Sequence, residues 1–313
     1  MRGRGLAMGR WLVFGLALVA LAGSARAGEP VRAVATFSIL ADLVRAVGGA
    51  HVAVSSLVGP DADAHGYSPA PGDSRTLARA DVVVLNGLGF EGWIERLVKA
   101  SGARAALVVA AKGIITIPGR HAHAHDHAPG QTGDADHAPD PHAWQSIPNV
   151  KIYVANIRDG LAKADPAHAA DYAANAAAYL GRLDTLDAEI REAIAAIPPE
   201  HRRVITTHDA FGYFSAAYGL SFIAPQGVST DSEASPRDVA QIIRQIRRDK
   251  VPAVFLETIA DPRLMEQIAR ESGATIGGKV YSDALSGPTG PAPTYLDMMR
   301  ANLRAFRAAL GPA

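Results

Sequence analysis

The stretch AADYAANAAAYLGRLDTLDAEIREAIAAI, residues 169–197, decides how the rest of this chain is organised. It is rich in Ala and Leu, and its larger apolar residues recur at helical spacing. They are Tyr172, Ala176, Leu180, Leu183, Leu186 and Ile190. Pro198 and Pro199 end the pattern. At a rise of 1.5 Å per residue, this stretch predicts one helix of roughly 40 Å, in which Gly181 is a weak point.

Short apolar runs lie on both sides of this helix and alternate with amphipathic stretches. The runs before the helix are 31–36, 52–58, 82–87 and 105–110, and those after it are 203–207, 220–224, 252–257 and 275–281. Continuous apolar strands that alternate with helices are typical of a parallel sheet covered on both faces. The expected helices include 39–47, 91–100 and one that Ser235-Pro236 opens.

We therefore predict an α/β fold with two lobes, each built on a parallel sheet. The lobes are residues 28–166 and 200–313, and a linking helix, 167–199, joins them more stiffly than a flexible linker would. The alternative is an ordinary packed helix inside one larger domain, and the composition of the helix is compatible with both.

The first 27 residues have the pattern of a secretory signal peptide. Three arginines precede an apolar run from Trp11 to Ala22, and small residues occupy positions 25 and 27. The run of about a dozen residues is too short to span a bilayer, which needs about 20. We expect cleavage after Ala27, export to the periplasm, and no part for residues 1–27 in the fold.

Charge and cysteine content narrow the class of protein. The full chain is neutral, and removal of residues 1–27 takes away four arginines and no acidic residue, which leaves a net charge of −4. A mildly acidic chain without a basic stripe argues against a nucleic-acid partner. The chain has no Cys, so a transition-metal site would be built from His, Asp and Glu, and a lipid-bearing cysteine is excluded.

The segment 117–141 has the composition of a loop that captures metal. Among its Gly, Pro and Asp residues it carries His121, His123, His125, His127 and His137. Nothing apolar there compensates for the entropy lost on ordering, so we expect a mobile loop. Histidine-rich tracts favour metal binding, here as a secondary and weaker site; the alternative is a neutral spacer.

Three further histidines share a setting that favours ligand binding. His65 follows the strand expected at 52–58, His142 follows the histidine-rich segment, and His208 ends the strand at 203–207. The carboxyl ends of parallel strands are where open α/β sheets place ligands. Because His65 belongs to the first lobe and His208 to the second, they are expected to face each other across a cleft.

Four motifs make the chain resemble the zinc- and manganese-type solute-binding proteins of ABC importers. They are VGPDADAH (58–65), DPHAW (140–144), THDAFGYFSAAYG (207–219) and YSDALSGPTGPAPTYLDMMRAN (281–302). The resemblance covers essentially the whole mature chain. It implies two α/β lobes joined by one long rigid helix, with the metal between the lobes.

The resemblance also implies a ligand set and a role. The metal ligands would be His65, His142, His208 and Asp283. Because a metal-bound imidazole usually donates its other nitrogen to an acceptor, Asp209, Trp144 and Tyr67 are candidates for supporting the ligands, although Trp144 and Tyr67 are preferably plain packing residues. Glu257 ends a predicted strand; it is either an extra ligand or, preferably, half of a structural ion pair. The partner would be an ABC permease in the inner membrane, with a periplasmic metallochaperone as a second candidate, and the protein is expected to be a monomer.

The chemistry of that ligand set favours zinc over manganese. Three imidazoles and one carboxylate suit tetrahedral Zn²⁺, whereas Mn²⁺ prefers more oxygen ligands. The final motif is shared with relatives considered to carry manganese, so a manganese or mixed carrier is the alternative. Two other classes compete, a zinc hydrolase and a surface adhesin. The chain has no HExxH motif, and four protein ligands would close a hydrolytic site, so we expect no enzyme.

Overall fold

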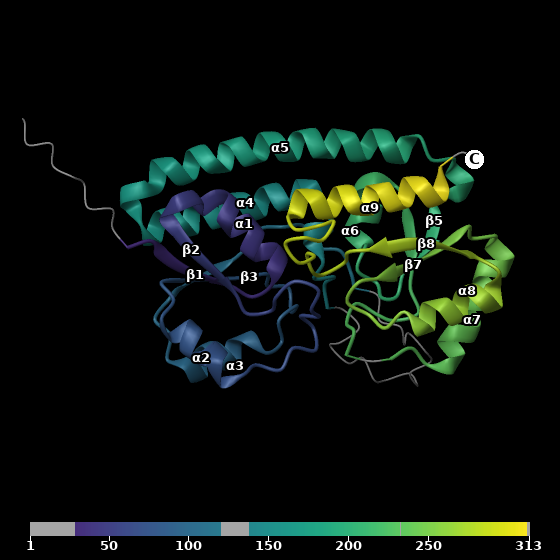
Figure 1. The fold of residues 1–313 in the computed structure, drawn as a ribbon, viewed down its shortest axis with the longest axis horizontal. Helices are drawn as coiled ribbons and strands as arrows, with labels where there is room; N and C mark the ends of the chain where they lie inside the picture. Colours follow the sequence, from purple (N-terminus) through teal and green to yellow (C-terminus); the bar gives the residue numbers. More distant parts are fainter. Residues whose placement is uncertain (1–28, 120–137, 232, 312–313) are drawn as a thin grey trace, which may run out of the picture.

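Two α/β lobes lie next to each other beneath one long helix in the computed structural model (Figure 1). The structure describes residues 29–119, 138–231 and 233–311. The predicted signal peptide and the histidines at 121–137 lie outside the described residues. The predicted fold class is confirmed, whereas the exact lobe boundaries stay a prediction.

The first lobe is built on a parallel sheet of four strands in the order β2-β1-β3-β4. The strands are β1 (Val31–Ala35), β2 (Val52–Ser56), β3 (Val82–Leu85) and β4 (Ala106–Val109). Helices α1 (Ser38–Gly48) and α4 (Ile147–Ala164) pack on the sheet, while α2 (Pro71–Ala78) and α3 (Ile94–Ser101) pack against each other below it (Figure 1). All four predicted strands of this lobe are present.

Helix α3 begins three residues later than the predicted start at residue 91. The side chain of Glu91 is buried and folds back onto the loop before it, where Oε1 accepts a hydrogen bond from the backbone N–H of Asn86 at 2.6 Å. The same carboxylate accepts from Thr36 Oγ1 at 2.6 Å. Glu91 therefore belongs to the loop that follows β3.

The second lobe repeats the first, with a parallel sheet in the order β6-β5-β7-β8. Its strands are β5 (Arg203–Ile205), β6 (Ser221–Ile223), β7 (Ala253–Glu257) and β8 (Thr275–Val280). Its helices are α6 (Gly212–Tyr218), α7 (Pro236–Asp249), α8 (Arg263–Ser272) and α9 (Tyr295–Leu310). As the Ser-Pro start predicts, Ser235 caps α7, and its Oγ accepts from the backbone N–H of Asp238 at 3.2 Å. Short 3₁₀ turns occupy Gly49–His51, Ala143–Gln145, Pro166–His168 and Pro199–His201.

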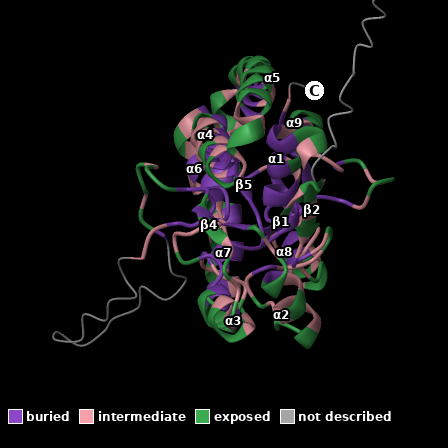
Figure 2. Ribbon diagram, turned by 90° about the vertical axis from the view of Figure 1, so that its left-hand side faces the viewer, coloured by how far each residue is buried: buried purple, intermediate pink, exposed green. Residues whose placement is uncertain are grey.

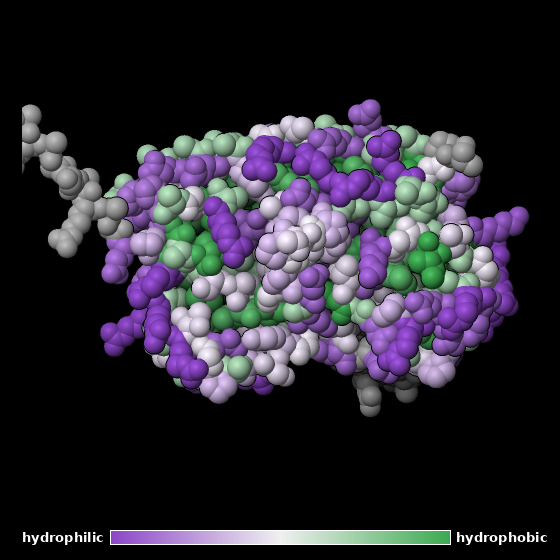
Figure 3. Space-filling model, viewed as in Figure 1, coloured by the Kyte–Doolittle hydropathy of each residue, from purple (hydrophilic) through white to green (hydrophobic). Residues whose placement is uncertain are grey.

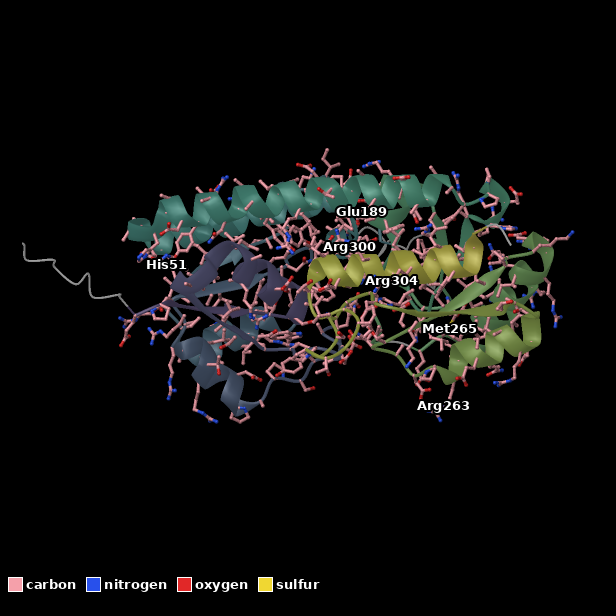
Figure 4. All side chains as sticks on the ribbon, turned by 45° about the horizontal axis from the view of Figure 1, so that its top comes forward. His51, Glu189, Arg263, Met265, Arg300 and Arg304 are labelled. Atoms are coloured by element: carbon pink, nitrogen blue, oxygen red, sulfur yellow. The ribbon has the colours of Figure 1, made fainter. Side chains whose placement is uncertain are left out.

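Helix α5 (Ala169–Ala195) runs above both lobes and is packed along its length. It contacts α1 and α4 in the first lobe and α6 and α9 in the second. Figure 2 shows its outer side exposed, and Figure 3 shows hydrophilic side chains over α5 and over α7 and α8. In Figure 4, Glu189 of α5 lies beside Arg300 of α9, with Oε2 of the carboxylate 2.9 Å from Nε of the guanidinium.

One continuous hydrophobic core runs through both lobes. It includes Val83 on β3, Leu183 on α5 and Phe255 on β7, all of them fully buried. A second, smaller core lies between the other face of the second sheet and helices α7 and α8, around Ile243 and Met265. The long helix therefore connects the lobes and at the same time completes a shared core.

Candidate metal centre

Four side chains from loops of both lobes converge between the sheets. His65 lies in the loop after β2, and His142 lies just before α4; both belong to the first lobe. His208 follows β5, and Asp283 follows β8, in the second lobe. The carboxyl ends of the strands thus place donors from both lobes together, as the sequence predicts. We call these four residues the donor cluster.

The donor atoms lie at the distances that ligands of one small ion adopt. Nε2 of His65 is 3.2 Å from Nε2 of His142 and 3.3 Å from Oδ2 of Asp283. Nε2 of His208 is 3.1 Å from the same oxygen. Each residue of the cluster offers one atom within 4.8 Å of the others, and no other such group occurs among the described residues. In a tetrahedral site with bonds of 2.0–2.1 Å, neighbouring donors are about 3.3 Å apart.

Three atoms of the donor cluster are buried and have no hydrogen-bond partner outside the cluster among the described residues. They are Nε2 of His208 and both carboxylate oxygens of Asp283. Both residues are fully buried. Buried polar atoms are nearly always hydrogen-bonded, because an unpaired one costs the free energy of its lost hydration. Unpaired atoms that point toward one place are the arrangement expected of metal ligands.

Two further carboxylates hold the imidazoles in orientation. Nδ1 of His142 is 2.8 Å from Oδ1 of Asp140, and Nδ1 of His208 is 2.5 Å from Oε2 of Glu257. In each case the hydrogen bond leaves Nε2 free to face the cluster. A carboxylate behind a metal-bound imidazole fixes its tautomer and makes it a better ligand. Asp140 is not among the site residues predicted from the sequence; its position two residues before His142 is the signal that indicates it.

Glu257 also organises the loop that carries His208. Its Oε1 accepts from the backbone N–H groups of Thr207 at 2.7 Å and of His208 at 3.0 Å. Its side chain is buried at the end of β7, so the loop after β5 is tied to the neighbouring strand. Glu257 contacts the imidazole opposite Asp283, which matches the ion-pair interpretation of this residue.

The electrostatics of the metal-free cluster are dominated by His208 and Asp283. Burial by itself would lower the pKa of His208, but the carboxylates of Glu257 and Asp283 outweigh it and raise this pKa well above its usual value. Burial by itself would raise the pKa of Asp283, but the imidazoles of His208 and His142 outweigh it and hold this pKa well below its usual value. The metal-free site therefore keeps a proton on His208, where a cation would otherwise balance the carboxylates.

The segments that carry His142 and Asp283 are bonded to each other across the lobes. Trp144 Nε1 and Gln145 Nε2 both donate to the carbonyl of Ser282, at 2.8 and 2.6 Å. Tyr295 at the start of α9 donates from its hydroxyl to the carbonyl of Trp144 at 2.7 Å. Since Ser282 precedes Asp283, these bonds join one donor of each lobe into a single unit.

The other predicted site residues lie further from the donors. Trp144 is buried with its ring edge-on to His142, and its centroid lies 5.2 Å from the imidazole. Tyr67 donates to Asp73 at 2.8 Å and packs on Trp93, so it supports the His65 loop from outside. Asp209 lines a separate cavity. The Nδ1 atoms of His142 and His208 are hydrogen-bonded to Asp140 and Glu257, respectively.

The remaining described histidines are remote from the donor cluster. His51 and His168 stack on each other with ring centroids 3.8 Å apart, at the end of α5 that lies over the first lobe (His51 in Figure 4). His201 lies close to the carbonyl of Leu310 through Nδ1. Each of the three ends a short 3₁₀ turn.

A buried set of three imidazoles and one carboxylate between two parallel-sheet lobes defines a metal-binding protein. The profile of the family described as zinc-uptake complex component A, periplasmic, matches residues 33–309. The chain belongs to this family, a family of metal-binding transport proteins that serve ABC importers.

Relatives and solved structures that are similar to this chain carry different metals in their names. The iron-binding protein YfeA of Yersinia pestis is 35% identical over 268 residues, which cover 86% of this chain and 82% of the relative. The manganese-binding lipoprotein MntA of Bacillus subtilis is 35% identical, with 91% of each chain covered. The periplasmic zinc binding protein TroA of Treponema pallidum superposes with a TM-score of 0.81 at 30% identity, covering 90% of this chain and all of that one. Membership of the family thus leaves the metal open.

Among the described residues, none of the helices combines the length and the apolar character needed to cross a bilayer.

Proposed function

We propose that this protein captures Zn²⁺ in the periplasm and delivers it to the permease of an ABC importer in the inner membrane. Removal of residues 1–27 after Ala27 would release the protein there. The family to which the chain belongs supports the transport role. Zinc is the cargo, bound by His65, His142, His208 and Asp283, and is passed on without being changed.

The observation that carries the proposal is the composition of the donor cluster. It offers three nitrogen donors and one carboxylate, all of them buried. The donor atoms of three pairs, His65 with His142, His65 with Asp283 and His208 with Asp283, lie 3.1–3.3 Å apart. Nitrogen donors in tetrahedral arrangement favour zinc, and zinc outbinds manganese and iron at most sites of this kind. The carboxylates of Asp140 and Glu257 strengthen the imidazoles as ligands.

A manganese or mixed carrier is the second candidate, and the relatives named for manganese favour it. Both oxygens of Asp283 face the cluster, Oδ2 toward His65 and His208, and Oδ1 at 3.7 Å from Nε2 of His142. A carboxylate that binds through both oxygens would provide five donors and a coordination closer to what Mn²⁺ accepts. Competition between the two metals separates the candidates.

Capture requires each imidazole to present a neutral Nε2. The metal replaces the proton on His208, and the buried carboxylates then balance the cation. Because the core is shared by both lobes, we expect binding and release to involve loops around the donor cluster, with little movement of the lobes.

The test is a titration of metal-free protein 28–313 with Zn²⁺ and Mn²⁺, separately and in competition, by calorimetry and native mass spectrometry. We expect one tightly bound zinc per chain that manganese does not displace, and at least a hundredfold weaker binding in His208→Ala. The matched control is His168→Ala, which removes a histidine outside the cluster. Tight manganese that zinc fails to displace would reject zinc as cargo, and indifference to His208→Ala would reject the ligand set.

The histidine-rich segment is proposed as a secondary collecting site for zinc. Its five histidines would bind zinc more weakly than the donor cluster. Its ends lie close to the cluster. The backbone N–H of Asp140, which is two residues before His142, donates to the carbonyl of Ile117 at 2.9 Å. Deletion of residues 121–137 should remove weak additional zinc and leave the tight site unchanged. A deletion that weakens the tight site would contradict this division.

Delivery from a periplasmic metallochaperone to the protein remains a further proposal, as does the monomeric state. Sedimentation of the metal-free and zinc-loaded protein tests the latter, with a single species at the mass of one chain expected in both.

A further inference from the structure

The loop that carries His65 is bonded directly to the second lobe at two places. The carboxylate of Asp61 accepts from the backbone N–H of Gly287 at 3.0 Å. The carboxylate of Asp63 accepts from Oγ1 of Thr230 at 2.6 Å through Oδ2. Through its other oxygen, Asp63 accepts from the backbone N–H of His65 at 2.9 Å. One side chain thus shapes the His65 loop and ties it to the opposite lobe.

The partner of Asp63 lies on a segment that is also bonded to the loop of His208. In this segment, residues 226–230, the N–H of Gln226 donates to the carbonyl of Thr207 at 3.3 Å. The carbonyl of Gly227 accepts from the N–H of Asp209 at 3.1 Å. The segment 226–230 therefore connects the residues on either side of His208 with Asp63, and through Asp63 with His65.

Solvent reaches the donor cluster beside this connection. His65 lines a cavity of about 540 Å³, which Val228 also lines. Its side chain is 5% exposed, whereas the side chains of the other three are 0% exposed. Asp63 and Thr230 line a neighbouring cavity of about 520 Å³. The hydrogen bond between them lies in the wall beside the most accessible donor.

We propose that the hydrogen bond between Thr230 and Asp63 is the latch that keeps His65 on the metal and sets the rate at which metal leaves. The inference rests on the proposed role of His65 as a ligand. Both latch residues are positioning residues, since neither belongs to the donor cluster. The bond to an ionised carboxylate is short and stronger than one between neutral groups. While it is made, His65 and the segment 226–230 stay together; once it opens, His65 swings toward the cavity and the metal is held by three donors.

The test measures zinc release from the loaded protein 28–313 by stopped-flow mixing with an excess of a chromogenic chelator. Thr230→Val removes the hydroxyl and keeps the shape, so we expect zinc release about tenfold faster, the effect of one charge-assisted hydrogen bond. Thr230→Ser keeps the hydroxyl, so its release should stay within twofold of the unaltered protein. Thr185→Val, on the exposed side of α5, is the control for loss of a threonine hydroxyl elsewhere.

Two further readouts distinguish a latch from a general loss of structure. The association rate of zinc and the unfolding temperature of the metal-free protein should be the same in Thr230→Val and Thr230→Ser. Equal release rates in these two variants would reject the latch, as would a faster release matched by an equal loss of stability. Tight zinc binding that His65→Ala leaves unchanged would reject the ligand role of His65, and the latch with it, while the carrier function would stand.

Discussion

Nδ1 of His208 lies 2.5 Å from Oε2 of Glu257, on the side of the imidazole opposite to the donor cluster. The two residues come from the ends of β5 and β7, which are neighbours in the second sheet. The pairing fixes which nitrogen of His208 faces the other donors. It also places a negative charge behind the ligand, where it stabilises the imidazole after a cation binds in front.

Exchange of Glu257 for Gln should weaken zinc binding by about 10–100-fold, because the neutral amide supports the imidazole less well. Competition with a chromogenic chelator measures the dissociation constant. Glu192→Gln, on an exposed part of α5, makes the same chemical change away from the cluster and should have no effect. Equal affinities in both variants would show that Glu257 only supports the fold.

Zinc binding should release protons and strengthen as pH rises. The pKa of His208 in the metal-free protein is raised, so below that pKa the incoming zinc displaces its proton. Calorimetry in two buffers of different ionisation enthalpy counts this proton. We expect about one proton from His208 at neutral pH and progressively less at higher pH. A pH-independent affinity would contradict the raised pKa.

The stability of the metal-free protein should depend on pH through His208 and Asp283. The raised pKa of His208 contributes stability that is fully present below the unfolded value of about 6.5 and is lost as pH rises through the folded pKa. The lowered pKa of Asp283 contributes stability that is present above about 3.9 and is lost as pH falls toward the folded pKa. Urea unfolding across pH, with His208→Gln for comparison, should show the alkaline loss disappear in the variant.

Gly181→Ala should stabilise the protein by about 0.5–1 kcal/mol, since glycine in a helix interior is less favourable than alanine. Gly181 is exposed on α5, and a Cβ added there meets nothing within 4 Å. Gly277→Ala is the opposite case, because its Cβ would lie 2.6 Å from the ring of Phe255. Overpacking of this kind costs about 1–3 kcal/mol. Urea unfolding of the metal-free variants measures both, and a destabilised Gly181→Ala would contradict the regular packing of α5.

The strands and the long helix could be predicted because their signals are local. Buried parallel strands read as unbroken apolar runs, and α5 repeats apolar residues along one side over 27 residues. The start of α3 was predicted too early because Glu91 looks like a good helix residue. Its carboxylate instead accepts hydrogen bonds from Thr36, which is 55 residues earlier in the chain, and from the backbone N–H of Asn86, which is 5 residues earlier. Periodicity gives no information about such contacts.

The donor cluster was suggested by position and completed by resemblance. His65 and His208 stand at strand ends, which the pattern reveals, whereas the role proposed for Asp283 came from its motif. The bonds that orient these residues were not predictable in the same way. Trp144 and Ser282 are 138 positions apart, and nothing in either local sequence indicates that one donates to the carbonyl of the other.

The single core beneath α5 has a consequence for how a transporter recognises this carrier. In a binding protein whose lobes move apart, the loaded and empty forms differ in overall shape. In this protein, Leu183 and Phe255 are packed in one core with both sheets, so we expect its outline to change little when metal binds. We therefore expect a permease to distinguish the loaded from the empty protein by small differences in the loops around the donor cluster. On this view, the conformation of a few loops, and not the arrangement of the lobes, depends on whether metal is bound.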